Sequence, residues 1–302
     1  MNPPDPAALR RRKANFAERH FDRLLVAPAI TVLLLIGVFP LVYLLMVSFQ
    51  QITMSEENRA FAGLLNYSRL FTDTRFWESV LHTLFIGAIA LPLELLLGLA
   101  MAQLLLDKLP GRQVFVALLV LPTVISPIVS GATWALLFDN RFGPINQMIG
   151  WVVGHPVTIL WTVKPDLVYP AILLCEVWQW TPFMFLLLLA ALSNVDKSQL
   201  EAAAIDGAGF WRTFFRIVLP AIRPVLAIAI LIRALDLFRV FDIIWALTKG
   251  GPGTMTETVS VFNYTQGFQQ FETSYTAAAS LVIVIILSVV IMVALRRMRI
   301  DR

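Results

Sequence analysis

Residues 201–224 read EAAAIDGAGFWRTFFRIVLPAIRP and form a polar stretch between two long apolar segments. Ser198 and Glu201 have the spacing of a capping box, in which two side chains satisfy free amides at the start of a helix. Gly207 can adopt a positive φ and end this first helix, and Pro220 is expected to end a second one. The stretch therefore predicts two short helices that lie outside the membrane.

The composition of the rest of the chain is that of an integral membrane protein. Of the 302 residues, 58% are hydrophobic and 15% are charged, and the mean hydropathy is +0.75. Soluble domains are less apolar and carry more charge. The single cysteine, Cys175, excludes an intrachain disulfide framework, and the three scattered histidines have no metal-ligand spacing. We therefore expect no metal site.

Six apolar segments are long enough to cross about 30 Å of hydrocarbon as helices. The candidate spans cover about 24–49, 78–106, 113–138, 169–193, 223–247 and 273–295. We expect an all-α integral membrane protein in which residues 24–302 form a single six-span domain. Residues 1–23 carry six Lys and Arg residues without apolar periodicity, so they are predicted to form a basic tail.

The distribution of basic residues predicts which side each segment faces. Six spans place both termini on one side, and the segments on that side hold sixteen Lys and Arg residues against six on the other. Basic residues concentrate in cytoplasmic segments. Both termini and the polar loop at about 196–222 are therefore expected in the cytoplasm. The net charge of +4 follows from this topology, so no nucleic-acid partner is expected.

The polar loop resembles the EAA loop, a cytoplasmic segment of permease subunits in ATP-binding cassette (ABC) importers. Its spacing is most similar to the sugar-importing branch. The eleven matching positions are Glu201, Ala202, Ala203, Asp206, Gly207, Ala208, Phe214, Ile217, Leu219, Pro220 and Pro224. The resemblance implies a type I ABC importer permease fold, in which the first six of these residues couple the permease to an ATPase.

No Gly-x-x-x-x-Gly-Lys-Ser/Thr phosphate loop occurs in the sequence, and no catalytic constellation stands out. The chain is therefore expected to be a transport subunit that binds no cofactor itself and is not an enzyme. The resemblance implies two ABC ATPase subunits that carry ATP and Mg, a second homologous permease, and a periplasmic or surface solute-binding protein. It also implies a multi-pass location in the bacterial inner membrane, in contact with lipid.

Ionisable residues inside the predicted spans need an explanation, because each costs about 2.5–3.5 kcal/mol at a helix centre on insertion scales. Arg233, Asp236, Arg239 and Asp242 recur every three residues and would form one stripe on a helix. The stripe either lines a water-filled pathway or forms a ladder of structural salt bridges, with a structural role favoured for Arg233. Glu94 is expected to pair with a charge on a neighbouring helix.

The fourth span combines an acid, an amide and two tryptophans, namely Glu176, Gln179, Trp178 and Trp180, with Pro182 after them. This pattern is also similar to that of sugar permeases. Aromatic rings stack on the C–H faces of a sugar, and amides and carboxylates bind its hydroxyls. The four polar and aromatic residues are therefore candidates for the substrate pathway, together with Asp236, Arg239 and Asp242. For either tryptophan alone, packing against a neighbouring helix is the better interpretation.

These patterns together predict the permease subunit of an ABC importer that moves a sugar, polyol or glycoside by alternating access. Three alternatives remain open. A secondary transporter would use the charged stripe to carry protons, and an intramembrane enzyme would use Glu176 or Glu94 as a base. An ABC importer of a non-sugar solute is the third alternative.

Overall fold

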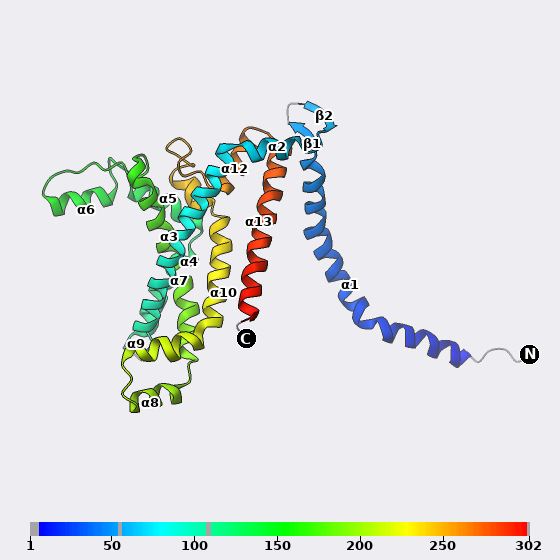
Figure 1. Cartoon of the computed structure of the whole chain (residues 1–302), viewed down its shortest axis with the longest axis horizontal. Coiled ribbons are helices and arrows are strands. Elements are labelled where there is room, and N and C mark those ends of the chain that lie inside the picture. Colours follow the sequence, from blue (N-terminus) through cyan, green and yellow to red (C-terminus); the bar gives the residue numbers. More distant parts are fainter. Residues whose placement is uncertain (1–5, 54–55, 107–109, 301–302) are drawn as a thin grey trace, which may run out of the picture.

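The computed structural model describes residues 6–53, 56–106 and 110–300, and it consists mostly of helices that run side by side (Figure 1). Within this described part, five helices are long and apolar enough to cross a membrane. They are α1 (Pro6–Ser48), α3 (Thr74–Leu104), α7 (Pro165–Ser193), the continuous helix Phe210–Phe238 that ends in α10 (Leu219–Phe238), and α13 (Thr273–Ile300). The predicted fold class is confirmed.

The third predicted span, at about 113–138, is broken in the structure. Helices α4 (Arg112–Val124) and α5 (Pro127–Leu137) meet at 96°. Ile125 and Ser126 between them are extended, with ψ of 135° and 134°. Pro127 disfavours helical dihedrals in the residue before it, and this explains why the helix stops there.

Pro220 does not end the second helix of the polar stretch, contrary to the prediction. Helix α9 (Phe210–Thr213) continues through a π-helical turn, η1 (Phe214–Val218), into α10. In the wide turn the amide of Leu219 bonds to the carbonyl of Phe214. A proline lacks an amide hydrogen, and a local change of hydrogen-bond register accommodates it within a continuous helix.

The basic N-terminal segment is part of a helix, because α1 is helical from Pro6 onward and runs without interruption into the first span. Residues 1–5 of the predicted tail lie outside the described residues. Ala, Leu, Arg, Lys and Glu dominate this segment and are strong helix formers, so helical structure needs no apolar face here.

Short elements fill the external segments, including a hairpin that the sequence did not predict. Strands β1 (Gln50–Thr53) and β2 (Glu56–Phe61) pair antiparallel. The remaining elements are α2 (Leu65–Thr72), α6 (Pro144–Val153), α11 (Asp242–Leu247), α12 (Val259–Tyr264) and the π-helical turn η2 (Thr265–Gln269).

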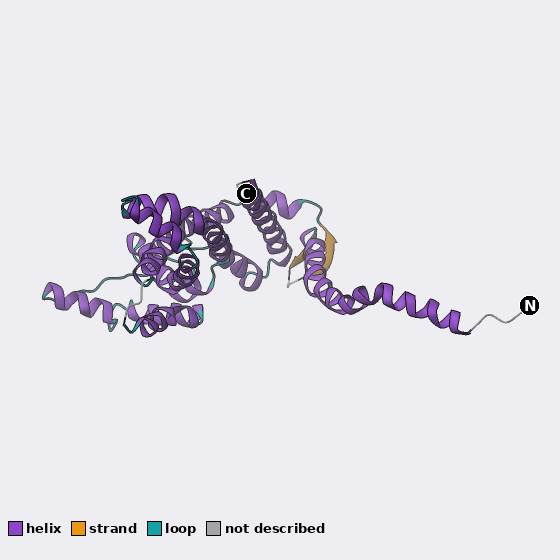
Figure 2. Ribbon diagram, turned by 90° about the horizontal axis from the view of Figure 1, so that it is seen from below, coloured by secondary structure: helices purple, strands orange, loops and turns teal. Residues whose placement is uncertain are grey.

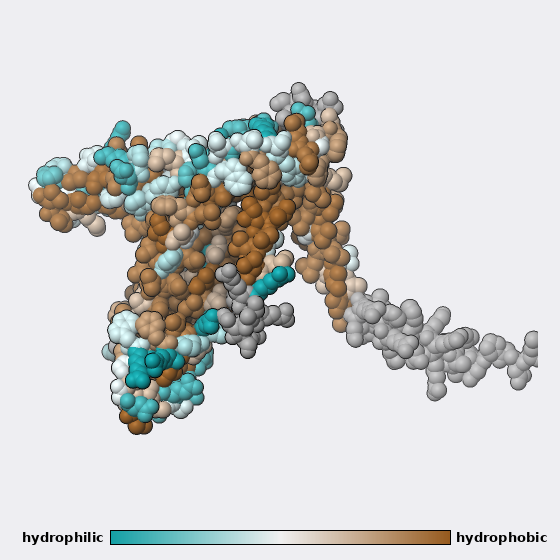
Figure 3. All heavy atoms as spheres, in the orientation of Figure 1, coloured by the Kyte–Doolittle hydropathy of each residue, from teal (hydrophilic) through white to brown (hydrophobic). Residues whose placement is uncertain are grey.

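Helices α3 and α7 form the centre of the bundle, and a glycine allows their close approach. A Cβ on Gly98 would lie 2.7 Å from the Cβ of Met184 and 2.8 Å from the backbone nitrogen of Phe185. Small residues at such crossings let membrane helices pack backbone to backbone. Apolar side chains cover the flanks of the spans, and hydrophilic residues gather at both ends of the bundle (Figure 3).

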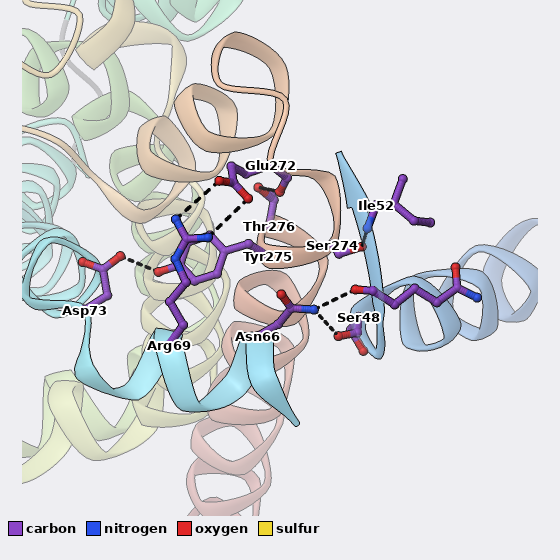
Figure 4. A network of polar contacts seen from close by, with 10 residues as sticks. Ser48, Ile52, Asn66, Arg69, Asp73, Glu272, Ser274, Tyr275 and Thr276 are labelled. Atoms are coloured by element: carbon purple, nitrogen blue, oxygen red, sulfur yellow. Dashed lines mark hydrogen bonds and ion pairs between the residues drawn. The ribbon is translucent and has the colours of Figure 1, made fainter. Parts of the chain in front are cut away.

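A polar network at the external end fastens α1 and α2 to α13 (Figure 4). Asn66 donates to the carbonyls of Ser48 and Gln50, each at 2.9 Å, and the amide of Ile52 donates to Ser274 Oγ at 3.0 Å. Below this clamp α1 diverges from the bundle (Figures 1 and 2), and most of its described side chains are exposed. The first span therefore lies outside the core of the bundle.

A second part of the same network joins α2 directly to α13. Arg69 forms an ion pair with Glu272 at 3.3 Å and lies 4.4 Å from the ring centre of Tyr275. The hydroxyl of Tyr275 in turn donates to Asp73. These contacts hold the external surface together across about two hundred residues of sequence.

Candidate functional site

Three buried charged side chains from three different spans meet inside the bundle. Arg233 on α10 donates from Nε and Nη2 to the two carboxylate oxygens of Glu94 on α3, at 2.7 and 2.8 Å. Its Nη2 also donates to Oε1 of Glu176 on α7 at 2.6 Å. No more than 2% of each side chain is exposed. Buried charges are tolerated when they are paired and hydrogen-bonded, and the predicted pairing of Glu94 is confirmed.

A cavity of about 360 Å³ lies above this triad of Glu94, Arg233 and Glu176. Glu176 and Arg233 form its buried floor, and the guanidinium of Arg233 lies 4.6 Å from the ring centre of Trp180, which also lines it. Five of the seven residues expected on the substrate pathway line this cavity: Glu176, Trp180, Asp236, Arg239 and Asp242.

The charges of the fifth span do not form one stripe on a single helix, so that expectation was wrong. Helix α10 ends at Phe238, and α11 begins at Asp242 after a break. Arg233 bonds to α3 and α7, and Asp236 accepts a bond from Arg239 Nη2 at 2.6 Å. A continuous proton-carrying ladder, as in the secondary-transporter alternative, does not exist in this arrangement.

Two broken spans meet at the cavity. Pro127, the first residue of α5, and Val240, in the break between α10 and α11, both line it. Beyond the breaks, α5 packs closely on α11, where a Cβ on Gly131 would lie 2.8 Å from the Cβ of Ala246. Irregular backbone occurs at membrane depth only where it is buried in protein or faces a water-filled cavity. The breaks are therefore typical of a polar ligand pathway.

Glu176 keeps an unused acceptor at the floor of the cavity. Its Oε1 accepts the bond from Arg233, and its Oε2 is buried without a hydrogen-bond partner among the described residues. An unsatisfied buried carboxylate oxygen costs free energy unless a donor reaches it. A hydroxyl group of a ligand in the cavity can supply that donor.

The other two residues expected on the pathway, Trp178 and Gln179, do not line the cavity. Trp178 packs edge-on against Trp134, with ring centres 5.7 Å apart, as the packing interpretation proposed. Gln179 Nε2 donates to the carbonyls of Pro122 and Ile125 at 2.7 and 2.8 Å. It therefore caps the C-terminal end of α4 and fixes the break in the third span.

Sequence reasoning missed the uncharged part of the lining, including Phe241 and Ile243. The sequence placed both residues inside a continuous fifth span, where an apolar side chain gives no sign that it lines a cavity. Phe241 has φ −131° and ψ −57° at the start of α11, so the local backbone departs from the helix there. No proline lies between residues 225 and 247, so no sequence signal marked a break at this point.

The predicted coupling residues lie on and just after a short helix, α8 (Lys197–Ile205), which projects from one end of the bundle (Figure 1). Asp196, and not Ser198, caps it, because the Asp196 carboxylate accepts the amide of Ser198 at 2.9 Å. Gly207 has φ +71°, as the sequence predicts. Four of the six residues are exposed, namely Glu201, Ala202, Asp206 and Gly207. Ala208 is half-buried and Ala203 is buried.

Ile205, at the end of α8, is 87% exposed and was not predicted as a site residue. An isolated exposed aliphatic residue is ordinary on a surface, but this one lies within the exposed coupling segment. Beneath α8 a groove of about 470 Å³ is lined by residues from both helices of the polar stretch, among them Ala202, Asp206 and Arg216. The projecting helix and the groove form a surface suited to a protein partner.

Comparison with known proteins identifies similar chains. The family model described as "Binding-protein-dependent transport system inner membrane component" matches residues 94–302. The trehalose/maltose transport system permease protein MalF of Thermococcus litoralis is 36% identical over 254 residues, which cover 83% of this chain and 85% of that protein. The sulfoquinovosyl glycerol transport system permease protein SmoG of Agrobacterium fabrum is 32% identical over 291 residues, or 95% and 93% of the two chains.

A solved structure shares the fold. It belongs to a bacterial ABC transporter involved in the import of the acidic polysaccharide alginate, and it superposes with a TM-score of 0.80 at 22% identity. The match covers 95% of this chain and 98% of the other.

Proposed function

Because this chain belongs to the family of binding-protein-dependent transport system inner membrane components, we propose that it is the permease subunit of an ATP-driven importer. The proposed cargo is a sugar, polyol or glycoside, and the proposed location is the bacterial inner membrane. The chain is a membrane transport subunit and not itself an enzyme. Alternating access moves the cargo between the two sides.

The single observation that carries the cargo assignment is the cavity between the two broken spans. It brings together an unused carboxylate oxygen of Glu176, the exposed charged groups of Arg239 and Asp242, and the ring of Trp180. Hydrogen-bonding groups next to an aromatic ring suit a polyhydroxylated ligand with both hydroxyls and C–H faces. Two relatives named for trehalose or maltose and for sulfoquinovosyl glycerol support the same class.

The partners follow from the projecting α8 surface and from the family. Two ATPase subunits, which would hold ATP and Mg, are proposed to receive α8 and the residues up to Ala208. A second homologous permease completes the pathway, and a solute-binding protein delivers the cargo to the external loops. Because a ligand shifts a conformational equilibrium only through differential affinity, the ATPase must bind α8 differently in its open and closed states.

Reconstitution tests the proposal. The chain is coexpressed with the proteins encoded beside it, and the purified complex is placed in lipid vesicles with radiolabelled maltose, trehalose, glycerol, an amino acid or phosphate outside. We expect uptake of a sugar or polyol that requires ATP and the solute-binding protein. Uptake that continues without an ATPase subunit would make the chain a secondary transporter, and ATP-driven uptake of only the amino acid or phosphate would overturn the cargo assignment.

A further inference from the structure

We propose that the cavity above the triad selects neutral, hydroxyl-rich ligands and rejects sugars that carry a carboxylate. This inference rests on the proposed function and specifies the chemical class of its cargo. It depends on the balance of charge around the cavity and on the Glu176 carboxylate oxygen that has no hydrogen-bond partner among the described residues.

Carboxylates outnumber guanidinium groups around the cavity. Among the described residues that line it, Glu176, Asp236 and Asp242 are acidic, and Arg233 and Arg239 are basic. Each Arg is already engaged. Arg239 Nη2 bonds to Asp236 Oδ1 at 2.6 Å, and Arg233 bonds to two carboxylates, one of which belongs to Glu94 directly behind the floor. Within the lining itself, three carboxyl groups therefore stand against two guanidinium groups.

Two of the carboxylates around the cavity keep acceptor capacity. Oε2 of Glu176 has no partner among the described residues, and the Glu176 side chain is 2% exposed. Asp242 is exposed and lines the cavity. Hydroxyl groups donate to carboxylates, whereas a ligand carboxylate has no hydrogen to donate and is repelled. In a site partly withdrawn from water this repulsion is weakly screened.

The fold alone does not impose this selectivity. A structure with the same fold belongs to a transporter involved in the import of an acidic polysaccharide, so a bundle of this shape is compatible with an anionic cargo. The difference must lie in the side chains around the pathway. In this chain both guanidinium groups lie beside carboxylates of the same chain, and these carboxylates offset their positive charge.

Direct binding to the assembled importer tests the proposal. The purified complex without its solute-binding protein is titrated with maltose and with the matched disaccharide in which one hydroxymethyl group is oxidised to a carboxylate. Saturation-transfer NMR gives the two dissociation constants. We expect the neutral sugar to bind at least about tenfold more tightly, because tenfold corresponds to about 1.4 kcal/mol, the repulsion from one uncompensated charge about 12 Å away at an effective dielectric constant near 20.

Two matched variants separate a local effect from a general change in surface charge. Asp242→Asn removes the exposed carboxylate of the cavity lining, and it should narrow the preference for the neutral sugar several-fold. Asp166→Asn removes an exposed carboxylate from the first turn of α7, outside the cavity lining, and it should leave the preference unchanged.

The outcomes distinguish this inference from the proposed function. Equal binding of the two disaccharides by the unmodified complex, or equal shifts in the two variants, would overturn the selectivity. Failure of ATP-dependent uptake of any neutral sugar or polyol in vesicles would instead remove the proposed function on which it rests.

Discussion

Arg233 is held by three contacts within the bundle, and its environment decides what its removal would cost. The two carboxylates that it bonds come from α3 and α7, and the ring of Trp180 lies against the guanidinium. Breaking a buried ion cluster by removing one partner leaves the other charges uncompensated. That outcome is far more costly than the loss of an exposed ion pair, which contributes about 0–1 kcal/mol.

Arg233→Met is therefore expected to destabilise the folded protein by about 3–5 kcal/mol, because it leaves Glu94 and Glu176 without a cation. Thermal unfolding of the purified complex in detergent measures the effect as a fall in Tm. The control is Arg239→Met, since the side chain of Arg239 is 72% exposed and should contribute little stability. Equal Tm values for the two variants would contradict a central structural role for the triad.

A second prediction at this scale concerns Gln179, which donates to two carbonyls at the break between α4 and α5. Gln179→Leu leaves both carbonyls without this donor, and it should weaken the joint by about 1–3 kcal/mol. Hydrogen exchange at amides 123–130 should then become faster. Gln113→Leu, at an exposed position of α4, serves as control, and unchanged exchange in Gln179→Leu would exclude the capping role.

At the scale of elements, the crossing of α3 and α7 organises the bundle. The two helices carry Glu94 and Glu176, so their spacing sets the geometry of the triad. Gly98 lies four residues after Glu94 on α3, directly against the backbone of α7. Side chains four residues apart lie on the same face of a helix, so Gly98 and Glu94 share one face of α3.

Gly98→Ala is expected to destabilise the protein by about 1–3 kcal/mol, because the added methyl group would force the two backbones apart. Gly37→Ala on α1 is the matched control, since a Cβ there meets nothing within 4 Å. Comparison of the Tm values of the two variants tests the crossing. A Gly98→Ala protein as stable as the control would show that the helices can separate without loss.

At the scale of the whole molecule, the cavity and the coupling surface lie at different positions along one continuous helix. Phe210–Phe238 starts beside α8 and reaches the cavity through Arg233 and Asp236. A displacement of α8 therefore has a direct structural route to the triad. The sequence predicted a stop at Pro220, which would have separated the two regions.

Gly207→Val should uncouple transport from ATP hydrolysis or prevent assembly, because Gly207 has φ +71° and a β-branched residue is strained there. No atom lies within 4 Å of a Cβ at this position, so the effect arises from the backbone and not from a clash. Sugar uptake per ATP hydrolysed in vesicles is the measurement. Gly209→Val, at φ −71° and ψ 166° with equally open space, should behave as the unmodified protein.

Normal coupling in Gly207→Val would show that the turn after α8 is not part of the transmission route. A loss of coupling in both glycine variants would point instead to crowding at the ATPase surface. The pair thus separates the conformation of the turn from the bulk of the side chain.

The sequence by itself determined the class of the molecule and predicted its orientation in the membrane. Apolar length, the distribution of Lys and Arg, and the residues from Glu201 to Ala208 are properties of neighbouring positions in the chain. They were sufficient to predict a helical membrane protein with an exposed coupling segment. The rarity of charge within spans was also enough to single out Glu94, Glu176 and Arg233 as residues that need partners.

Only the tertiary structure decided which side chains pair with these residues and which residues line the cavity. Arg233 is 57 residues from Glu176 and 139 from Glu94, and three-residue periodicity within one span favoured Asp236 instead. The breaks at Ile125 and Arg239 likewise depend on capping and packing by other helices, such as the bond from Gln179. Inside a packed bundle, contacts between distant segments compete with the local preference of each segment for a helix. The free energy of such a contact depends on how deeply it is buried, and a local sequence pattern does not reveal that burial.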